Sequence, residues 1–198
     1  MDPLMIELPA LLASERLLLR APRAGDGAAL NDAVTESFDA LKPWMPWAQK
    51  LPTADESELT CRQMAARFVQ RTDLPMFIFE RVAGGECGRF IGGTGLHRFD
   101  WDVPRFEVGY WCRCSLQGRG YVTEAVQTLA RFAFDGLHAR RVEIRMSSAN
   151  TPSRAVAERC GFTFEGVLRQ DSLGVDGRAR DTLVYARVRG AEEPDNTK

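Results

Sequence analysis

The sequence predicts a mixed α/β fold, in which one central and mostly antiparallel sheet of six or seven strands carries helices on both faces. Two patterns of apolar residues lead to this prediction, because strands alternate with a period of two and buried helical faces repeat every three or four residues. A third observation makes the sheet mixed. One helix joins two strands, at 105–114 and 141–147, and such a connection implies a right-handed parallel crossover.

The elements follow one another along the chain without an internal repeat or a linker between domains. The expected strands, which share alternation or a short apolar run, are 16–21, 75–82, 89–97, 105–114, 141–147, 162–168 and 180–188. The expected helices, which share a one-sided apolar stripe, begin near residue 26 and span about 53–71, 121–134 and 151–159.

Both helices of the first half have a recognisable start. Asp26 is a suitable N-cap for the first helix. The second helix begins near Thr53 or Asp55 and is expected to bury Leu59 and Phe68.

The segment KPWMPW between these helices places Trp44 and Trp47 on a loop that prolines stiffen. Aromatic side chains held in this way could line a substrate pocket. They could equally form a hydrophobic plug over the core, and the sequence leaves both interpretations open.

The stretch Arg105–Ala125 joins a strand to a helix through the turn Gln117-Gly118-Arg119-Gly120. A helix start presents unpaired backbone N–H groups to one point in space, where they favour an anion such as phosphate. Glycines let the backbone approach a ligand closely, and Arg119 adds a positive charge. The turn matches neither a P-loop nor a dinucleotide-binding turn, and it could also be a plain entry into the helix.

Composition excludes several classes of function. A net charge of −1 argues against bulk attraction to nucleic acid or to an anionic membrane. The five cysteines show neither zinc spacing nor histidine partners, so we expect no metal and reduced thiols in the cytoplasm. The N-terminus lacks a basic region, and no apolar stretch is long enough to span a bilayer.

Six segments, in this order and spacing, resemble the GNAT superfamily of acetyl-CoA-dependent N-acetyltransferases, and most closely its RimJ/RimL-type branch of ribosomal-protein N-terminal acetyltransferases. The segments are ERLLLR at 15–20, KPWMPW at 42–47, GYW at 109–111, QGRGYVTEA at 117–125, RVEIR at 141–145 and NTPSRAVAERCGF at 150–162. The resemblance covers about 14–188 and implies a single GNAT domain there. The polar tail at 189–198 is expected to be disordered.

The resemblance implies acetyl-CoA as co-substrate. Its diphosphate would lie in the turn and helix start, and its pantetheine arm would lie along the strand 105–114, where that strand splays from 141–147. The implied cofactor contacts are Trp111, Cys112, Arg113, Gln117, Gly118, Arg119, Gly120, Tyr121, Val122, Thr123, Asn150 and Ser153. Among them, Val122 stands where the family pattern ends in glycine or alanine.

Acetyl transfer requires a neutral amine, whereas an amine with a pKa of about 8 to about 10 is mostly charged at neutral pH. Glu107 is the expected base, because a partly buried carboxyl has a raised pKa. It could instead form a salt bridge with a neighbouring arginine such as Arg105. His97 is the rival base and, with Trp44 and Trp47, a candidate substrate contact, although a lone histidine is more often a packing or surface residue.

A second group would give a proton to the departing thiolate. Many GNAT enzymes carry a tyrosine seven residues after the position of Asn150, where this chain has Ala157. In the RimL-type branch a serine three residues after the asparagine is proposed instead, and Ser153 fits that place. Ser153 could equally cap its helix. Cys112 and Cys114 could touch the cofactor or be small buried residues, and we expect no covalent cysteine chemistry.

The resemblance thus implies an N-acetyltransferase that acts on a primary amine, either a protein N-terminus or a small molecule such as a polyamine or an aminoglycoside. The alternative is a catalytically weak acyl-CoA-binding or partner-binding module on the same fold. A nucleotide-binding regulator is disfavoured by the missing P-loop. The resemblance also allows a homodimer.

Overall fold

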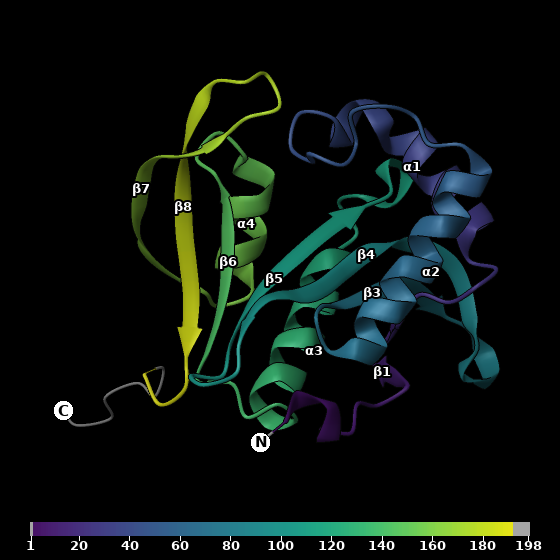
Figure 1. Ribbon diagram of the computed structural model, residues 1–198, viewed down its shortest axis with the longest axis horizontal. Helices are drawn as coiled ribbons and strands as arrows, with labels where there is room; N and C mark the ends of the chain where they lie inside the picture. The colour runs from purple at the N-terminus through teal and green to yellow at the C-terminus, as the bar shows by residue number, and fades with distance from the viewer. Residues whose placement is uncertain (1, 192–198) are drawn as a thin grey trace.

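The computed structural model describes residues 2–191, and a single eight-stranded sheet forms its centre (Figure 1). The strands are β1 Leu11–Ala13, β2 Leu17–Arg20, β3 Leu74–Arg81, β4 Cys87–Asp100, β5 Arg105–Cys112, β6 Arg141–Ser147, β7 Thr163–Leu173 and β8 Ala179–Val188. They lie in the order β1-β2-β3-β4-β5-β6-β8-β7, and within the described residues β5 and β6 form the one parallel pair. The mixed, mostly antiparallel sheet is confirmed, with β1 as a strand that alternation did not reveal.

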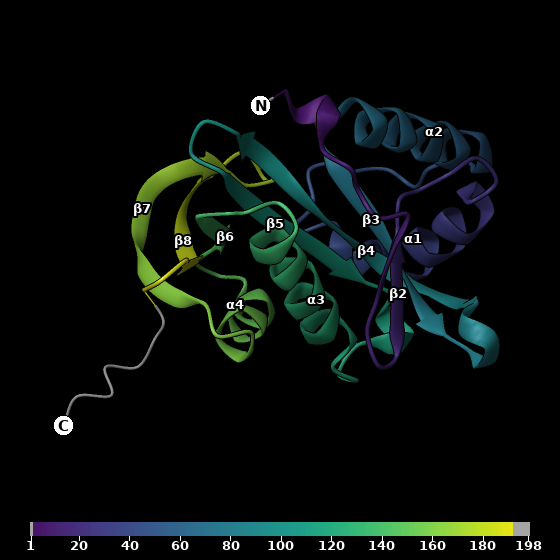
Figure 2. The same ribbon diagram turned by 90° about the horizontal axis from the view of Figure 1, so that it is seen from below.

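Helices cover both faces of this sheet, as Figure 2 shows with α3 and α4 on one side and α1 and α2 on the other. The helices are α1 Gly27–Leu41, α2 Ala54–Gln70, α3 Tyr121–Asp135 and α4 Thr151–Arg159, and the 3-10 turns are η1 Pro3–Met5, η2 Ala83–Gly85 and η3 Cys114–Leu116. Two apolar clusters result. The larger lies between the sheet and α3 with α4, and the smaller lies between β3, β4 and the pair α1 and α2.

The predicted apolar stripe of α3 is confirmed. Ala125, Val126, Leu129 and Ala133 are fully buried, and Val122 packs against the same core while half-buried. Because burying a valine or leucine side chain contributes about 1.5–3 kcal/mol, Val126 and Leu129 hold α3 firmly beneath β5 and β6. The start of α3 is therefore fixed relative to the strand that precedes it.

Strands β5 and β6 separate after a short paired segment. Their register pairs Arg105 with Arg141, Phe106 with Val142 and Glu107 with Glu143, whereas β6 continues to pair with β8 as far as Ser147. The amide of Arg113 donates to the carbonyl of Ile91 on β4. Because successive amides of a strand point to opposite sides, the amide of the residue before Arg113, and of every second residue back along β5, points toward the β6 side. We call the opening between β5 beyond Glu107 and β6 the splay. Its existence confirms the expected geometry of the sheet.

Helix α2 departs from expectation on its buried face. Thr53 is the N-cap and forms a capping box with Glu56, so the helix begins at the first of the two expected positions. Leu59 is 55% exposed, and the prediction that it is buried is wrong. Cys61 takes the inward position instead, while Phe68 packs partly against the larger core. The stripe is rotated because α2 packs on α1 as well as on the sheet.

The tail expected to be disordered falls mostly on residues 192–198, which lie outside the described residues. Within residues 2–191, none of the helices combines the length and the apolar character needed to cross a membrane.

Candidate active site

The turn before α3 has the backbone shape that an anion site needs. Gly118 and Gly120 have φ values of 74° and 80°, in the left-handed region that favours glycine. The helix hydrogen bonds begin where the amide of Glu124 donates to the carbonyl of Gly120, at 3.0 Å. The amides of the first turn, from Tyr121 to Thr123, therefore have no acceptor within the helix, and the helix dipole adds partial positive charge there.

Neighbouring side chains hold this turn in place. Arg16 forms an ion pair with Glu124 at 2.7 Å and donates to the carbonyl of Arg119 at 3.1 Å. The Arg119 guanidinium donates to the carbonyl of Ser115, and the Tyr121 hydroxyl donates to Glu80 at 2.9 Å. These contacts fix the loop from outside and leave the amides of the helix start to face the space beside it.

A hollow of about 580 Å³ adjoins this turn. Gly120 and Thr123 border it, and three arginines line it, namely Arg16, Arg131 and Arg159. The carboxylates of Glu15 and Glu124 also line the hollow, but Glu124 is neutralised by its ion pair with Arg16. Outside that ion pair, Arg131 and Arg159 stand against the one carboxylate of Glu15, so the hollow has an excess of positive charge that can attract an anionic group.

Glu107 lies at the last β5 position that pairs with β6, and its side chain is only 18% exposed. Its Oε2 atom is 3.3 Å from Arg98 Nε, yet it is buried without a hydrogen bond among the described residues. Burial raises the pKa of this carboxyl, against the opposing charges of Arg98 and Arg145. Arg105, the alternative ion-pair partner, pairs instead with Asp100 at 3.2 Å.

His97 faces Glu107 across the β4–β5 ladder, so the two candidate bases are neighbours on one face of the sheet. Its Nδ1 atom lies 2.6 Å from a carboxylate oxygen of Asp73, a residue that carried no signal in the sequence. The histidine is therefore held in place next to the splay.

Asn150 and Ser153 meet on the opposite side of the splay, at the start of α4. Asn150 is the N-cap, and its side-chain oxygen accepts from the amide of Ser153 at 3.1 Å. The Tyr110 hydroxyl donates to the Ser153 carbonyl and lies 3.0 Å from Ser153 Oγ. Burial raises the pKa of Tyr110 to about 12, so this phenol is neutral. The role of Tyr110 could not be predicted from the sequence, because only the packing of α4 against β5 brings it to Ser153.

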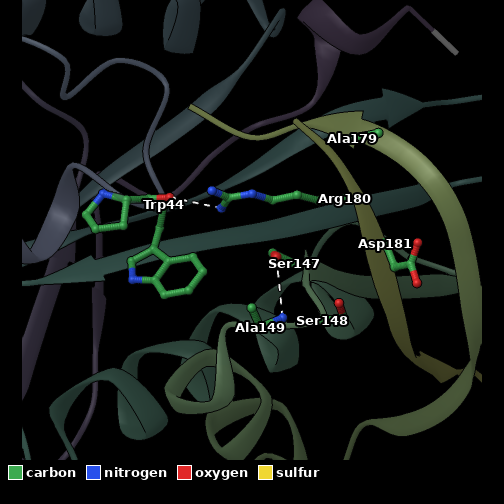
Figure 3. Close-up of a pocket in the computed structure, with 8 residues that line it drawn as sticks. Trp44, Ser147, Ser148, Ala149, Ala179, Arg180 and Asp181 are labelled. Atoms are coloured by element: carbon green, nitrogen blue, oxygen red, sulfur yellow. Dashed lines mark hydrogen bonds between the residues drawn. The ribbon is translucent and has the colours of Figure 1, made fainter. Parts of the chain in front are cut away.

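The two tryptophans of the KPWMPW loop occupy different places. Trp47 is 52% exposed and packs edge-on against Trp111, with ring centroids 5.9 Å apart. Trp44 lines an open hollow of about 460 Å³ together with Arg180, Ser147, Ala149 and others (Figure 3). The Arg180 guanidinium lies over the Trp44 ring and donates to the carbonyl of Pro43. This loop thus borders a hollow on the side of β6 and β8.

The other predicted cofactor contacts lie at the end of β5. Arg113 pairs with Asp32 of α1 at 2.6 Å, so its charge is already compensated. Burial raises the pKa of Cys112 to about 11, which keeps its thiol protonated at neutral pH. Gln117 donates to the carbonyl of Cys112 at 3.4 Å. No cluster of potential metal ligands occurs between residues 2 and 191.

Comparison with known sequences identifies the family. The acetyltransferase (GNAT) domain model matches residues 16–163. YdaF of Bacillus subtilis (strain 168), named provisionally as a ribosomal N-acetyltransferase, is 30% identical over 181 residues, which cover 89% of this chain and 93% of YdaF. The ribosomal-protein-serine acetyltransferase of Escherichia coli (strain K12) is 27% identical over 175 residues, which cover 88% of this chain and 94% of that protein.

Solved structures agree with this match. RimL, a ribosomal L7/L12 α-N-protein acetyltransferase in complex with coenzyme A, superposes with a TM-score of 0.79 at 25% identity, covering 90% of this chain and 97% of RimL. The microcin C7 self-immunity acetyltransferase MccE, in complex with acetyl-CoA and AMP, shares the fold with a TM-score of 0.80 at 24% identity, over 88% of this chain and 93% of MccE. The chain therefore belongs to the GNAT family and is an acetyl-CoA-dependent N-acetyltransferase.

Proposed function

We propose that this enzyme acetylates the N-terminal α-amine of a protein substrate and that Glu107 is its base. One observation carries the proposal: β5 and β6 separate directly after Glu107, so a half-buried carboxylate lies at the mouth of an opening in the sheet. The hollow that Trp44 and Arg180 line is open rather than enclosed, which suits an extended peptide better than a small polycation. The names of YdaF, RimL and the Escherichia coli relative point to the same class of substrate.

Acetyl-CoA supplies an acetyl group already activated as a thioester. Two features of this chain fit that molecule. The unpaired amides of the α3 start, from Tyr121 to Thr123, suit its diphosphate, and the unpaired edge of β5 suits the amides of its pantetheine arm. An amide on the same edge can donate a hydrogen bond to the oxygen that gains charge during transfer.

Glu107 then accepts a proton from the attacking nitrogen, directly or through a water molecule. The raised pKa of Glu107 makes its carboxylate a better proton acceptor than an exposed glutamate. Its neighbour Arg98 opposes this rise in the pKa of Glu107, because the guanidinium favours the charged form of the carboxyl.

Ser153 acts on the leaving group, the thiolate of coenzyme A. Its amide is fixed by Asn150 and its carbonyl by Tyr110, so the hydroxyl is held at the end of α4 nearest β5. From there it donates a hydrogen bond to the departing thiolate. Tyr110 therefore acts as a positioning residue for Ser153.

The hollow beside the helix start suits the nucleotide end of the co-substrate. Arg131 and Arg159 line it, and Arg159 Nε also donates to Thr123 Oγ1, at 3.4 Å. Because a guanidinium binds phosphate through parallel hydrogen bonds, these two arginines are suited to the 3′-phosphate of coenzyme A.

A mass-shift screen tests the proposed substrate class. Purified enzyme and acetyl-CoA are incubated with peptides bearing free N-termini, with the same peptides blocked at the N-terminus, and with polyamines and aminoglycosides. We expect a single acetyl group on the free peptides and none on the blocked ones. Acetylation confined to the small amines would refute the proposed substrate and leave the acetyltransferase assignment intact.

A further inference from the structure

We propose that Asp73 and His97 form a proton-accepting dyad at the splay, in which His97 Nε2 deprotonates the incoming ammonium group and Asp73 orients the imidazole. This inference rests on the proposed acetylation of an amine and adds a residue, Asp73, and a step to it. Glu107 keeps its role in the transfer itself.

The contact between the two residues determines the tautomer. His97 Nδ1 lies 2.6 Å from Asp73 Oδ1, and the two side chains are 35% and 18% exposed. A carboxylate can only accept a hydrogen bond, so Nδ1 carries the hydrogen. In the neutral ring Nε2 then holds a lone pair, free to accept a proton.

Two glycines leave room for that nitrogen beside the splay. A Cβ atom added at Gly95 or at Gly109 would come within 3.0 Å of His97 Nε2, so the imidazole lies over these two residues, where side chains would otherwise stand. Gly109 lies two positions beyond the last residue of β5 that pairs with β6. Nε2 therefore lies over the β4–β5 pair, at the level where β5 has already left β6.

A β-bulge sets the charges around the dyad. The register of β4 shifts between His97 and Asp100, and Arg98 adopts a left-handed φ of 49°. This bulge brings Arg98 beside Glu107, at 3.3 Å, while His97 remains opposite the same carboxylate. From α2, Arg67 lies 3.8 Å from Asp73. The charged groups facing His97 are thus Asp73, Glu107, Arg98 and Arg67.

The reaction of an ammonium substrate releases two protons, and the site offers one acceptor for each. An amine that arrives as an ammonium ion loses one proton before it can attack and a second once the nitrogen–carbon bond has formed. In the first step an N–H bond of the ammonium breaks and an Nε2–H bond forms. The imidazolium is paired with Asp73 and returns its proton to solvent, to which the side chain is exposed. Glu107 takes the second proton as the carbon–sulfur bond breaks.

The test is the pH dependence of the rates of four variants. We would compare kcat for Asp73→Asn, His97→Gln, Glu107→Gln and the control Asp100→Asn, from about pH 6 to about pH 10, with a peptide whose amine has a pKa of about 8. Asp100 is a suitable control because it also forms an ion pair on β4, with Arg105. Thermal melting confirms that each variant is folded.

We expect Asp73→Asn and His97→Gln to lower kcat about tenfold or more at neutral pH. This deficit should shrink above the pKa of the amine, which then arrives neutral. Glu107→Gln should show its deficit at every pH, and Asp100→Asn none. Asp73→Glu should recover part of the loss, because it restores an acceptor for Nδ1.

Two results would overturn the dyad: an unchanged kcat at neutral pH, or a deficit in Asp73→Asn that is the same at every pH, as a purely structural role would give. If the free peptides are not acetylated, the proposed substrate fails separately. The same series is then run on the amine that is acetylated, and the pH at which the deficit disappears should move to the pKa of that amine.

Discussion

Replacement of Glu107 by glutamine should slow acetyl transfer and stabilise the fold at the same time. A positioned general base contributes about 10²-fold to 10⁴-fold, so we expect kcat to fall by at least about 10²-fold while the Kd for acetyl-CoA stays within about twofold. Glutamine keeps the shape of the side chain and removes its negative charge and its ability to take a proton. The assay is thiol release at saturating acetyl-CoA, with the Kd measured by calorimetry.

The stability effect follows from the surroundings of the carboxylate. Oε2 of Glu107 is buried without a hydrogen bond, and an unsatisfied buried acceptor costs about 1–3 kcal/mol. The variant loses the ion pair with Arg98, which offsets part of this, so it should gain about 1 kcal/mol in the free energy of unfolding at neutral pH. Because the folded-state pKa is raised, the native state binds more protons than the unfolded state does. The gain should therefore vanish below the ordinary pKa of glutamate, about 4.3, and grow as the pH rises through the raised value.

Glu143 provides a matched control. It is the β6 partner of Glu107, its side chain is also 18% exposed, and it accepts from Arg141 at 2.9 Å. Glu143→Gln should lose stability and keep its activity. Equal kcat values for Glu107→Gln and the wild type, or equal losses in both variants, would refute the reasoning.

Three further variants test the cofactor site and the core. Gly120→Ala must adopt a φ of 80°, which costs about 1–2 kcal/mol, and it should weaken acetyl-CoA binding about tenfold by calorimetry; unchanged affinity would contradict the turn's role. Arg159→Ala should weaken binding of coenzyme A and leave that of dephospho-coenzyme A unchanged; equal losses would remove the 3′-phosphate from the hollow. Asp26→Asn breaks a buried pair with Arg20 (2.7 Å) and should cost about 3 kcal/mol in urea unfolding. Since the pKa of Asp26 is lowered, the wild-type advantage should be lost as the pH falls through the folded-state value, and an advantage independent of pH would contradict this.

The parts of the fold that depend on local residue patterns were predictable from the sequence. The stripe of α3, the parallel crossover and the glycine turn each have a period or a residue type that marks them, and the structure contains all three. Strand β1 has only three residues and no alternation to reveal it. Leu59 was misplaced because α2 packs against α1 as well as the sheet, which rotates its buried face.

The site was only partly predictable for a similar reason. The sequence marks the segments that contain three of the site residues, namely Glu107, His97 and Ser153. It does not mark their partners, because strand register and the packing of the elements determine which residues lie beside them. Arg98 reaches Glu107 through a bulge that no local residue pattern marks, so the neighbouring arginine that pairs with this carboxylate is Arg98 and not Arg105. Asp73 is separated from His97 by 24 residues, and only the folded sheet brings them together.

The most direct test of this account is a crystal structure of the enzyme with acetyl-CoA. We expect the diphosphate on the amides of Tyr121, Val122 and Thr123, and the thioester in the splay between Glu107 and Ser153. A co-substrate whose diphosphate lay away from the start of α3, or whose thioester lay outside the splay, would contradict the account.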